Sequence, residues 1–325
     1  MHTSGTRHLT SNWTRALGRA AGVAALLLAT AAPALADGRS AVHNLFANAA
    51  RARINLGMTE NSVMVAPSLV RGMYVLTSGR GEFAGFVNEA GTLYGDSFGM
   101  KVYAPSGAAP RPMTPQEQEE LRAEMMAAID YDKLIKVTYG DGGGRRMVMF
   151  SAVDCPYCKT FEENFSVIGR TNNTTFYVAP SSLRASTAGG REAWQAVSQI
   201  WCDSNNGEAW KHYWATKQLP AARACAFDAA TAESAVGNLK SILMAGGMKI
   251  MAVPSILRED GVLMRAADLK AYLKQPAPPV STSTQPVWLA AADSYQMQRV
   301  NEPVQQTSQR SNKIHVGDVL KKLIK

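Results

Sequence analysis

No apolar run in this sequence of 325 residues reaches the ~20 residues that a helix needs to cross a bilayer. A shorter apolar run, residues 20–30, follows three arginines and precedes a small-x-small tripeptide at residues 34–36. Residues 1–36 contain no acidic residue, and no cysteine lies near residue 36, which argues against a lipid anchor. These features predict a signal peptide cleaved after residue 36 and disfavour a retained membrane anchor. We therefore expect a mature protein in an oxidising compartment.

Strong charge of one sign is also missing from the middle of the chain. The formal net charge is +8, but residues 1–36 hold three arginines and no acid, and residues 275–325 hold six basic and three acidic groups. A formal charge of only +2 is left for residues 37–274, which argues against a nucleic-acid partner. A hydrophobic fraction of 46% and a charged fraction of 18% are typical of a globular protein.

Cysteine is scarce, with four residues that allow three pairings. Cys155 and Cys158 form a C-x-x-C motif and are too close together for an ordinary structural disulfide. Cys202 and Cys225 are far enough apart to close a loop. One reactive pair and one structural pair is the simplest division of the four.

The chain lacks a second close pair of metal ligands. A C-x-x-C motif can be half of a zinc site, but the other half should be a further close Cys or His pair. Cys202 and Cys225 stand apart, and the five histidines form no such pair. The glycine-rich residues 140–144 lack the Lys-Ser/Thr of a phosphate-binding loop. We therefore expect no metal and no cofactor.

The first part of the mature chain shows one helix pattern and several short strand patterns. Apolar residues on one face predict a helix over residues 42–54. Strand patterns separated by Gly-rich turns follow at residues 73–77, 82–87 and 92–94. The core of such a region is small, and pairing with a second copy would enlarge it.

Residues 104–112 have the composition of a linker. A helix begins after Thr114, with Pro115 at the first helical position and Glu117 completing a capping box. This helix either connects two domains or lies on the surface of the second one.

The second part of the chain alternates strand and helix patterns. Strands are expected at residues 147–150 and 175–178, helices at 155–168, 193–201 and 269–274, and a hairpin at 255–264. Residues 275–325 are rich in Pro, Ser, Thr and Gln, which predicts a disordered tail.

The C-x-x-C motif follows a buried strand and opens a helix. Cys155 then lies at the helix N-terminus, where unpaired amides and the macrodipole favour the thiolate that attacks disulfides. Pro156 is well tolerated in a first helical turn. Cys158 lies one turn further on and is expected to be more buried, as a resolving thiol. The alternative, a degenerate and non-catalytic module, is disfavoured because both cysteines are intact.

These residues resemble the periplasmic thiol:disulfide isomerases of the DsbC/DsbG type, members of the thioredoxin superfamily. Residues 148–159, around Cys155-Pro156-Tyr157-Cys158, resemble the family's catalytic strand and motif. Residues 68–77 resemble the start of its N-terminal dimerisation domain, and residues 200–202 the segment with its first structural cysteine. Val253 and Pro254 fall at the family's cis-proline loop, although Val stands where we expect Thr.

The resemblance implies an α+β protein with a signal peptide at residues 1–36 and a small helix-plus-antiparallel-sheet dimerisation domain at 37–111. A linker helix would occupy 112–138, a thioredoxin fold with a helical insertion 139–274, and the tail 275–325. It also implies a structural Cys202–Cys225 disulfide, worth ~3 kcal/mol for a loop of this size.

The implied function is a periplasmic, homodimeric isomerase or reductase that acts on mispaired exported proteins and has weak chaperone activity. Isomerisation needs a reduced cysteine pair, which implies a membrane electron donor of the DsbD type. A net thiol oxidase is one alternative, because Val253 and Pro156 are compatible with a more oxidising pair. A dedicated assembly factor for an envelope secretion or conjugation apparatus is another, motivated by the extra tail.

Overall fold

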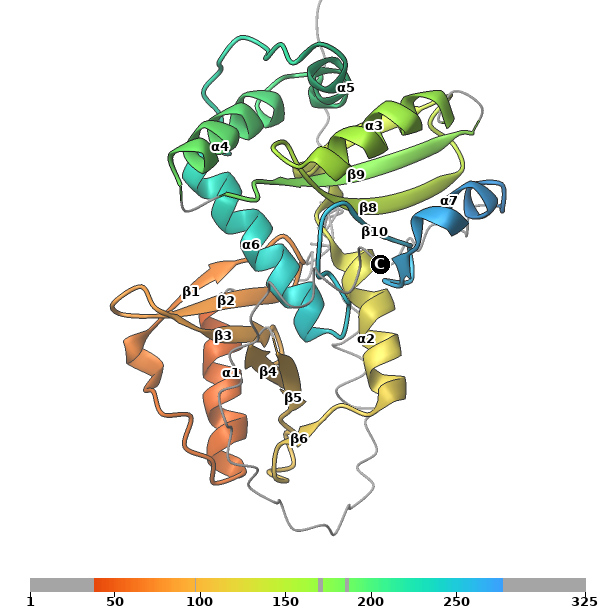
Figure 1. The fold of residues 1–325 in the computed structure, drawn as a ribbon. Helices are drawn as coiled ribbons and strands as arrows, with labels where there is room; N and C mark the ends of the chain where they lie inside the picture. The colour runs from red at the N-terminus through yellow and green to blue at the C-terminus, as the bar shows by residue number, and fades with distance from the viewer. Residues whose placement is uncertain (1–37, 97, 169–171, 185–186, 277–325) are drawn as a thin grey trace, which may run out of the picture. The chain divides into compact units, whose positions relative to one another are not determined.

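The computed structural model describes residues 38–96, 98–168, 172–184 and 187–276, which fold into two β-sheets with helices around them (Figure 1). The described residues all belong to one unit of the chain, Ala36–Lys325. The expected signal peptide lies outside them, as does all of the expected tail after residue 276.

The first sheet is a six-stranded antiparallel meander preceded by helix α1 (Gly38–Arg51). Its strands follow one another in chain order: β1 (Val63–Pro67), β2 (Met73–Ser78), β3 (Phe83–Asn88), β4 (Leu93–Asp96), β5 (Gly99–Val102) and β6 (Arg111–Pro112). Leu45 of α1 is fully buried in a cluster with Leu76 and Val87 of the sheet. Gly91 has a φ of +64°, and a Cβ there would lie 2.2 Å from the Leu45 nitrogen, so the helix and the β3–β4 turn require glycine.

Helix α2 (Pro115–Ala128) begins with the capping box that the sequence predicts. The Thr114 hydroxyl accepts the Glu117 N–H at 3.2 Å, and the Glu117 carboxylate accepts the Thr114 N–H at 2.7 Å. Both carboxylate oxygens of Glu117 also accept from Arg111, at 2.6 and 2.7 Å. The helix is shorter than the expected 112–138 segment, because Ile129 leaves helical geometry and forms an antiparallel bridge with Val70.

Replacing Thr114 with alanine is expected to lower the free energy of unfolding by about 1 kcal/mol, because the first turn of α2 loses its cap. Urea denaturation would measure the change. Gln116→Ala, an exposed substitution in the same turn, serves as the control and should stay within about 0.5 kcal/mol of wild type. Equal losses in the two variants would contradict a capping role for Thr114.

The second sheet has the strand order β11-β10-β8-β9-β7. Its strands are β7 (Ile135–Tyr139), β8 (Arg145–Ala152), β9 (Thr174–Ser181), β10 (Ser255–Leu257) and β11 (Leu263–Met264). Strands β8 and β9 are parallel, so they need a crossover, which α3 (Pro156–Ile168) supplies; the other neighbours are antiparallel. Six of the eight residues of β8 in succession, from Met147 to Ala152, are buried, as in a central strand.

Three helices lie between β9 and β10: α4 (Ala188–Trp201), α5 (Asn206–Thr216) and α6 (Ala229–Ala245). Helix α7 (Ala266–Leu273) follows the terminal hairpin. Mixed α and β structure, with a central β8-α3-β9 unit and a closing hairpin, is consistent with a thioredoxin-like fold.

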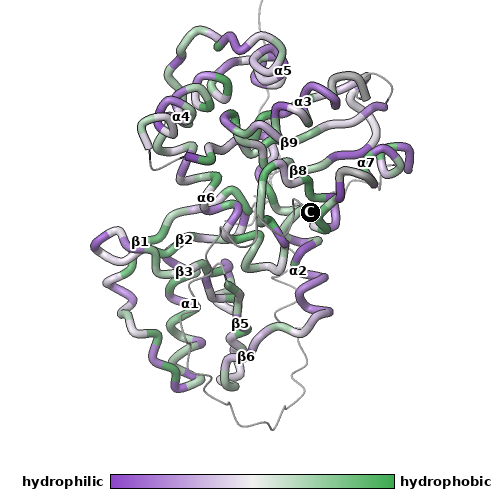
Figure 2. Tube along the Cα trace, viewed as in Figure 1, coloured by the Kyte–Doolittle hydropathy of each residue, from purple (hydrophilic) through white to green (hydrophobic). Residues whose placement is uncertain are grey.

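The helices differ in how apolar they are. Figure 2 shows α2 mostly in purple, whereas α6 carries more green. Four apolar side chains of α6, Val236, Leu239, Ile242 and Leu243, are buried. Among the described residues no helix is both long enough and apolar enough to cross a membrane.

Candidate redox site

Cys155 lies between the end of β8 and the first turn of α3. Its N–H donates to the Ala152 carbonyl at 3.1 Å, and its own carbonyl accepts the Lys159 N–H at 3.1 Å. The Cys158 N–H points at the Cys155 sulfur, 3.4 Å away. The Cys155 sulfur therefore receives a backbone donor at the helix end, where N–H groups have no partner within the helix.

Cys158 is the more enclosed thiol. Its side chain is fully buried, and its sulfur accepts the Ala152 N–H at 3.4 Å. Burial raises the pKa of the Cys158 thiol to about 12. Neither cysteine of the motif forms a disulfide in the structure. The Cys158 thiol therefore stays protonated at neutral pH.

The loop before β10 forms the other wall of the site. The Val253–Pro254 peptide bond is cis, and the Cys155 thiol donates to the Val253 carbonyl at 3.6 Å. The structure thus brings the two cysteines of the motif together with the Val253–Pro254 pair, which lies about one hundred positions later in the sequence. Pro156 and Tyr157, between the cysteines, are both exposed.

Asp154, directly before Cys155, is a site residue that the sequence analysis did not single out. Its side chain is only 6% exposed, and its carboxylate accepts hydrogen bonds from three consecutive residues after β9. The donors are the Ser182 hydroxyl at 3.0 Å, the Leu183 N–H at 2.8 Å and the Arg184 Nε at 3.4 Å. These partners lie 28 to 30 positions away, so no local pattern indicates them.

Glu162, one turn after Cys158 on α3, is a second buried acid that the sequence analysis missed. Its carboxylate accepts the Trp210 indole N–H of α5 at 2.9 Å and a hydrogen bond from Tyr139 of β7. Burial raises the pKa of Glu162 to about 7, although both hydrogen bonds and the charge of Lys217 act in the opposite direction. This carboxyl therefore titrates near neutral pH inside the core.

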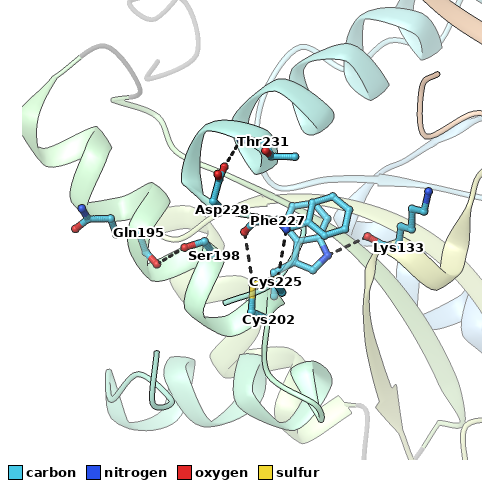
Figure 3. Close-up of a disulfide and its surroundings, with 9 residues drawn as sticks. Lys133, Gln195, Ser198, Cys202, Cys225, Phe227, Asp228 and Thr231 are labelled. Carbon is cyan, nitrogen blue, oxygen red and sulfur yellow. Dashed lines mark hydrogen bonds between the residues drawn. A yellow bond between two sulfur atoms is a disulfide. The ribbon is translucent and has the colours of Figure 1, made fainter. Parts of the chain in front are cut away.

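The other cysteine pair lies in the helical insertion, away from the redox motif in sequence. Cys202 and Cys225 are joined in a disulfide with their Cα atoms 5.5 Å apart (Figure 3). The Phe227 N–H donates to the Cys225 sulfur at 3.3 Å, and the Phe227 ring stacks on Trp201 at 4.3 Å. The Trp201 indole in turn donates to the Lys133 carbonyl at 2.9 Å. The bond therefore fastens the exposed segment before α6 to the end of α4.

Metal-binding side chains do not gather in the part of the chain that the structure describes: it holds no group of three or more His, Cys, Asp or Glu residues placed to share an ion.

The sequence resembles thiol:disulfide interchange proteins, which confirms the resemblance drawn from the motif. A relative described as a probable thiol:disulfide interchange protein DsbC, from Bordetella pertussis, is 27% identical over 115 residues. The match spans 35% of this chain and 38% of the relative's length. No family model matches the sequence.

Solved structures of similar proteins include a disulfide interchange protein from Neisseria gonorrhoeae, with 21% identity and a TM-score of 0.35. That match covers 44% of this chain and 95% of the other. Proteus mirabilis ScsC in a transitional conformation has 18% identity and a TM-score of 0.33, with 48% and 77% of the chains covered.

Proposed function

We propose that the protein is an exported thiol:disulfide oxidoreductase that rearranges wrong disulfides in periplasmic proteins. The observation that carries the proposal is the C-x-x-C thiol pair at the start of α3. The Cys155 sulfur lies between the Cys158 N–H and the Val253 carbonyl, and both thiols are buried, Cys155 at 3% exposed and Cys158 at 0%. Cys155, at the helix start, is then the attacking thiol and Cys158 the resolving one.

The reaction begins when the Cys155 thiolate attacks one sulfur of a client disulfide. A Cys155–client disulfide forms, the client S–S bond breaks, and the second client sulfur leaves as a thiolate. If another client thiolate then attacks the client sulfur of this bond, Cys155 is released and the client is isomerised. If Cys158 attacks Cys155 instead, the client leaves reduced and the Cys155–Cys158 disulfide remains.

Only the second outcome oxidises the enzyme. Each reductive release leaves a disulfide that must receive two electrons before the next cycle, which implies a membrane electron donor of the DsbD type. Burial raises the pKa of Cys158 to about 12 and so disfavours its thiolate in the reduced pair.

Recovery of activity by a scrambled multi-disulfide protein in glutathione buffer tests this function. Wild-type protein is expected to speed reactivation of the scrambled client more than it speeds oxidation of the same client in reduced form. The reverse order would make the protein a net oxidase, the alternative with which Val253 and Pro156 are compatible. If the protein shows neither activity, a binding role remains, such as that of a dedicated assembly factor.

We also propose that the protein is a homodimer joined through the first sheet. Phe98, at the β4–β5 turn, is 97% exposed. Beside it, β6 pairs only with Lys101 and Val102, so the described residues offer no strand partner to Gly99 and Met100 on that side. An open strand edge next to an exposed aromatic side chain suits pairing with a second copy.

Phe98→Ser is expected to raise the dissociation constant of the dimer by about tenfold or more, since buried aromatic anchors dominate interface energies. Light scattering after gel filtration, over a dilution series, would measure it. Ile54→Ser, an exposed apolar position after α1, is the matched control. A wild-type protein that is monomeric at all concentrations would contradict the dimer.

A further inference from the structure

The carboxylate of Asp154 fastens a loop to the redox motif. Among the described residues, its three hydrogen-bond donors belong to residues 182–184 and none belongs to α3. The side chain is 6% exposed, so the carboxylate itself offers little surface to a client protein. Its hydrogen bonds instead hold residues 182–184 in place.

The sheet topology places this loop beside Cys155. Strand β8 lies between β9 and β10 (Figure 1), and β8 pairs with β9 in parallel, with Ala152 opposite Ser181. Two residues past this pair, beyond the ends of both strands, the Leu183 N–H donates to the Asp154 carboxylate at 2.8 Å. The Val253–Pro254 loop precedes β10 on the opposite side of β8. Cys155 is therefore flanked by the 182–184 loop on one side and by the Val253–Pro254 loop on the other.

Exposed apolar side chains come from each segment around the thiol. Leu183 is 57% exposed, Tyr157 of the motif 78%, and Met251, two residues before Val253, 80%. Large apolar side chains in this position lose water contact when an extended polypeptide segment covers them. The Leu183 backbone N–H is the group that Asp154 holds most closely.

We propose that Asp154 is a positioning residue that holds Leu183 as a client contact, so that exchange favours client cysteines with an apolar neighbour. The inference rests on the proposed function and names the class of client segment that Cys155 prefers. The expected preference is about tenfold, which is the discrimination that one or two methylene groups give in an apolar contact.

Two synthetic peptides test it, each with one cysteine in a mixed disulfide with nitrothiobenzoate. One peptide has leucine beside the cysteine and the other has serine. The Cys155 thiolate attacks the peptide sulfur, a Cys155–peptide disulfide forms, and nitrothiobenzoate leaves as a coloured thiolate. Its release by the full reduced protein gives the second-order rate constant for each peptide, and their ratio is the preference.

Wild type is expected to prefer the leucine peptide about tenfold. Leu183→Ser and Asp154→Ala should each bring the ratio close to one. The variant with both substitutions should have the same ratio as each single variant, because Asp154 acts only through Leu183. Such dependence gives non-additive effects. Leu219→Ser, at an exposed apolar position in the insertion, should keep the wild-type ratio.

The proposal is overturned if wild type reacts with both peptides equally, or if Asp154→Ala slows both equally and keeps the ratio. Additive losses in the double variant would also overturn it. If Asp154→Ala does not fold, Ser182→Ala removes one of the three contacts and should lower the ratio in part; an unchanged ratio then counts against the proposal. No release from either peptide by wild type would instead sink the proposed function.

Discussion

Cys155→Ser is expected to reduce reactivation of a scrambled client to the uncatalysed background, whereas Cys158→Ala is expected to keep part of it. Serine cannot form the mixed disulfide, so every route begins and ends with Cys155. Without Cys158, a client thiol can still displace the enzyme from the mixed disulfide. Only the reductive release is lost. The first variant should therefore lose all catalysed reactivation, whereas the second should lose only the reductive route.

The Cys158→Ala variant should also accumulate a Cys155–client disulfide that is visible on a non-reducing gel. A double Cys202→Ala and Cys225→Ala variant is the control, since it removes the other sulfur pair. It should keep the exchange activity and lose about 3 kcal/mol of stability for a loop of this size. Equal loss of activity in Cys155→Ser and Cys158→Ala would contradict the division of roles, because it would mean that both thiols are needed for every turnover.

The redox pair could be placed from sequence because its signals are local. A buried strand, the C-x-x-C motif and a helix follow one another within about twenty residues, and the structure has β8 and α3 in those positions. The capping box at Thr114 and the hairpin around Gly261 are equally local and are confirmed. Short-range chemistry decides each of these elements.

Other elements could not be placed because tertiary contacts decide them. Four of the five residues of strand β7 fell inside the expected linker helix, yet the strand pairs along its whole length with β9, about forty residues later. Helices α5 and α6 were expected only as an insertion implied by the resemblance. Asp154 and Glu162 were missed for the same reason: a lone acidic residue carries no local signal, and its partners come from other elements. Sequence therefore placed the two cysteines of the motif at the junction of strand and helix, and left the acidic residues around them unseen.

Glu162 should make the protein less stable as the pH rises from about 4.5 to about 7. Burial holds its pKa at about 7 in the folded protein, above the ordinary value of 4.5. Between these values the folded state binds a proton that the unfolded state has lost, so stability falls as pH increases and levels off above pH 7. The full effect is on the order of 3 kcal/mol, at 1.36 kcal/mol for each pKa unit.

Glu162→Gln is expected to remove this dependence, because an amide keeps an oxygen for the Trp210 indole and cannot ionise. The variant should match wild type near pH 4.5 and exceed its stability by up to a few kcal/mol above pH 7. Denaturant unfolding of both proteins at several pH values would measure the difference. Glu124, whose pKa burial also raises to about 7, affects both proteins alike and cancels in that difference.

Glu163→Gln is the matched control, since this neighbouring acid is about half exposed and forms an i,i+4 ion pair with Lys159. Exposed pairs of this kind contribute ~0.5 kcal/mol or less, so the control should follow wild type across the range. A Glu162→Gln effect that is the same at every pH would mean that the carboxyl matters only as a hydrogen-bond acceptor. An effect that grows with pH would show that the ionised carboxylate is held in the core below α3 at a cost in stability, with Lys217 and the Trp210 and Tyr139 donors compensating its burial only in part.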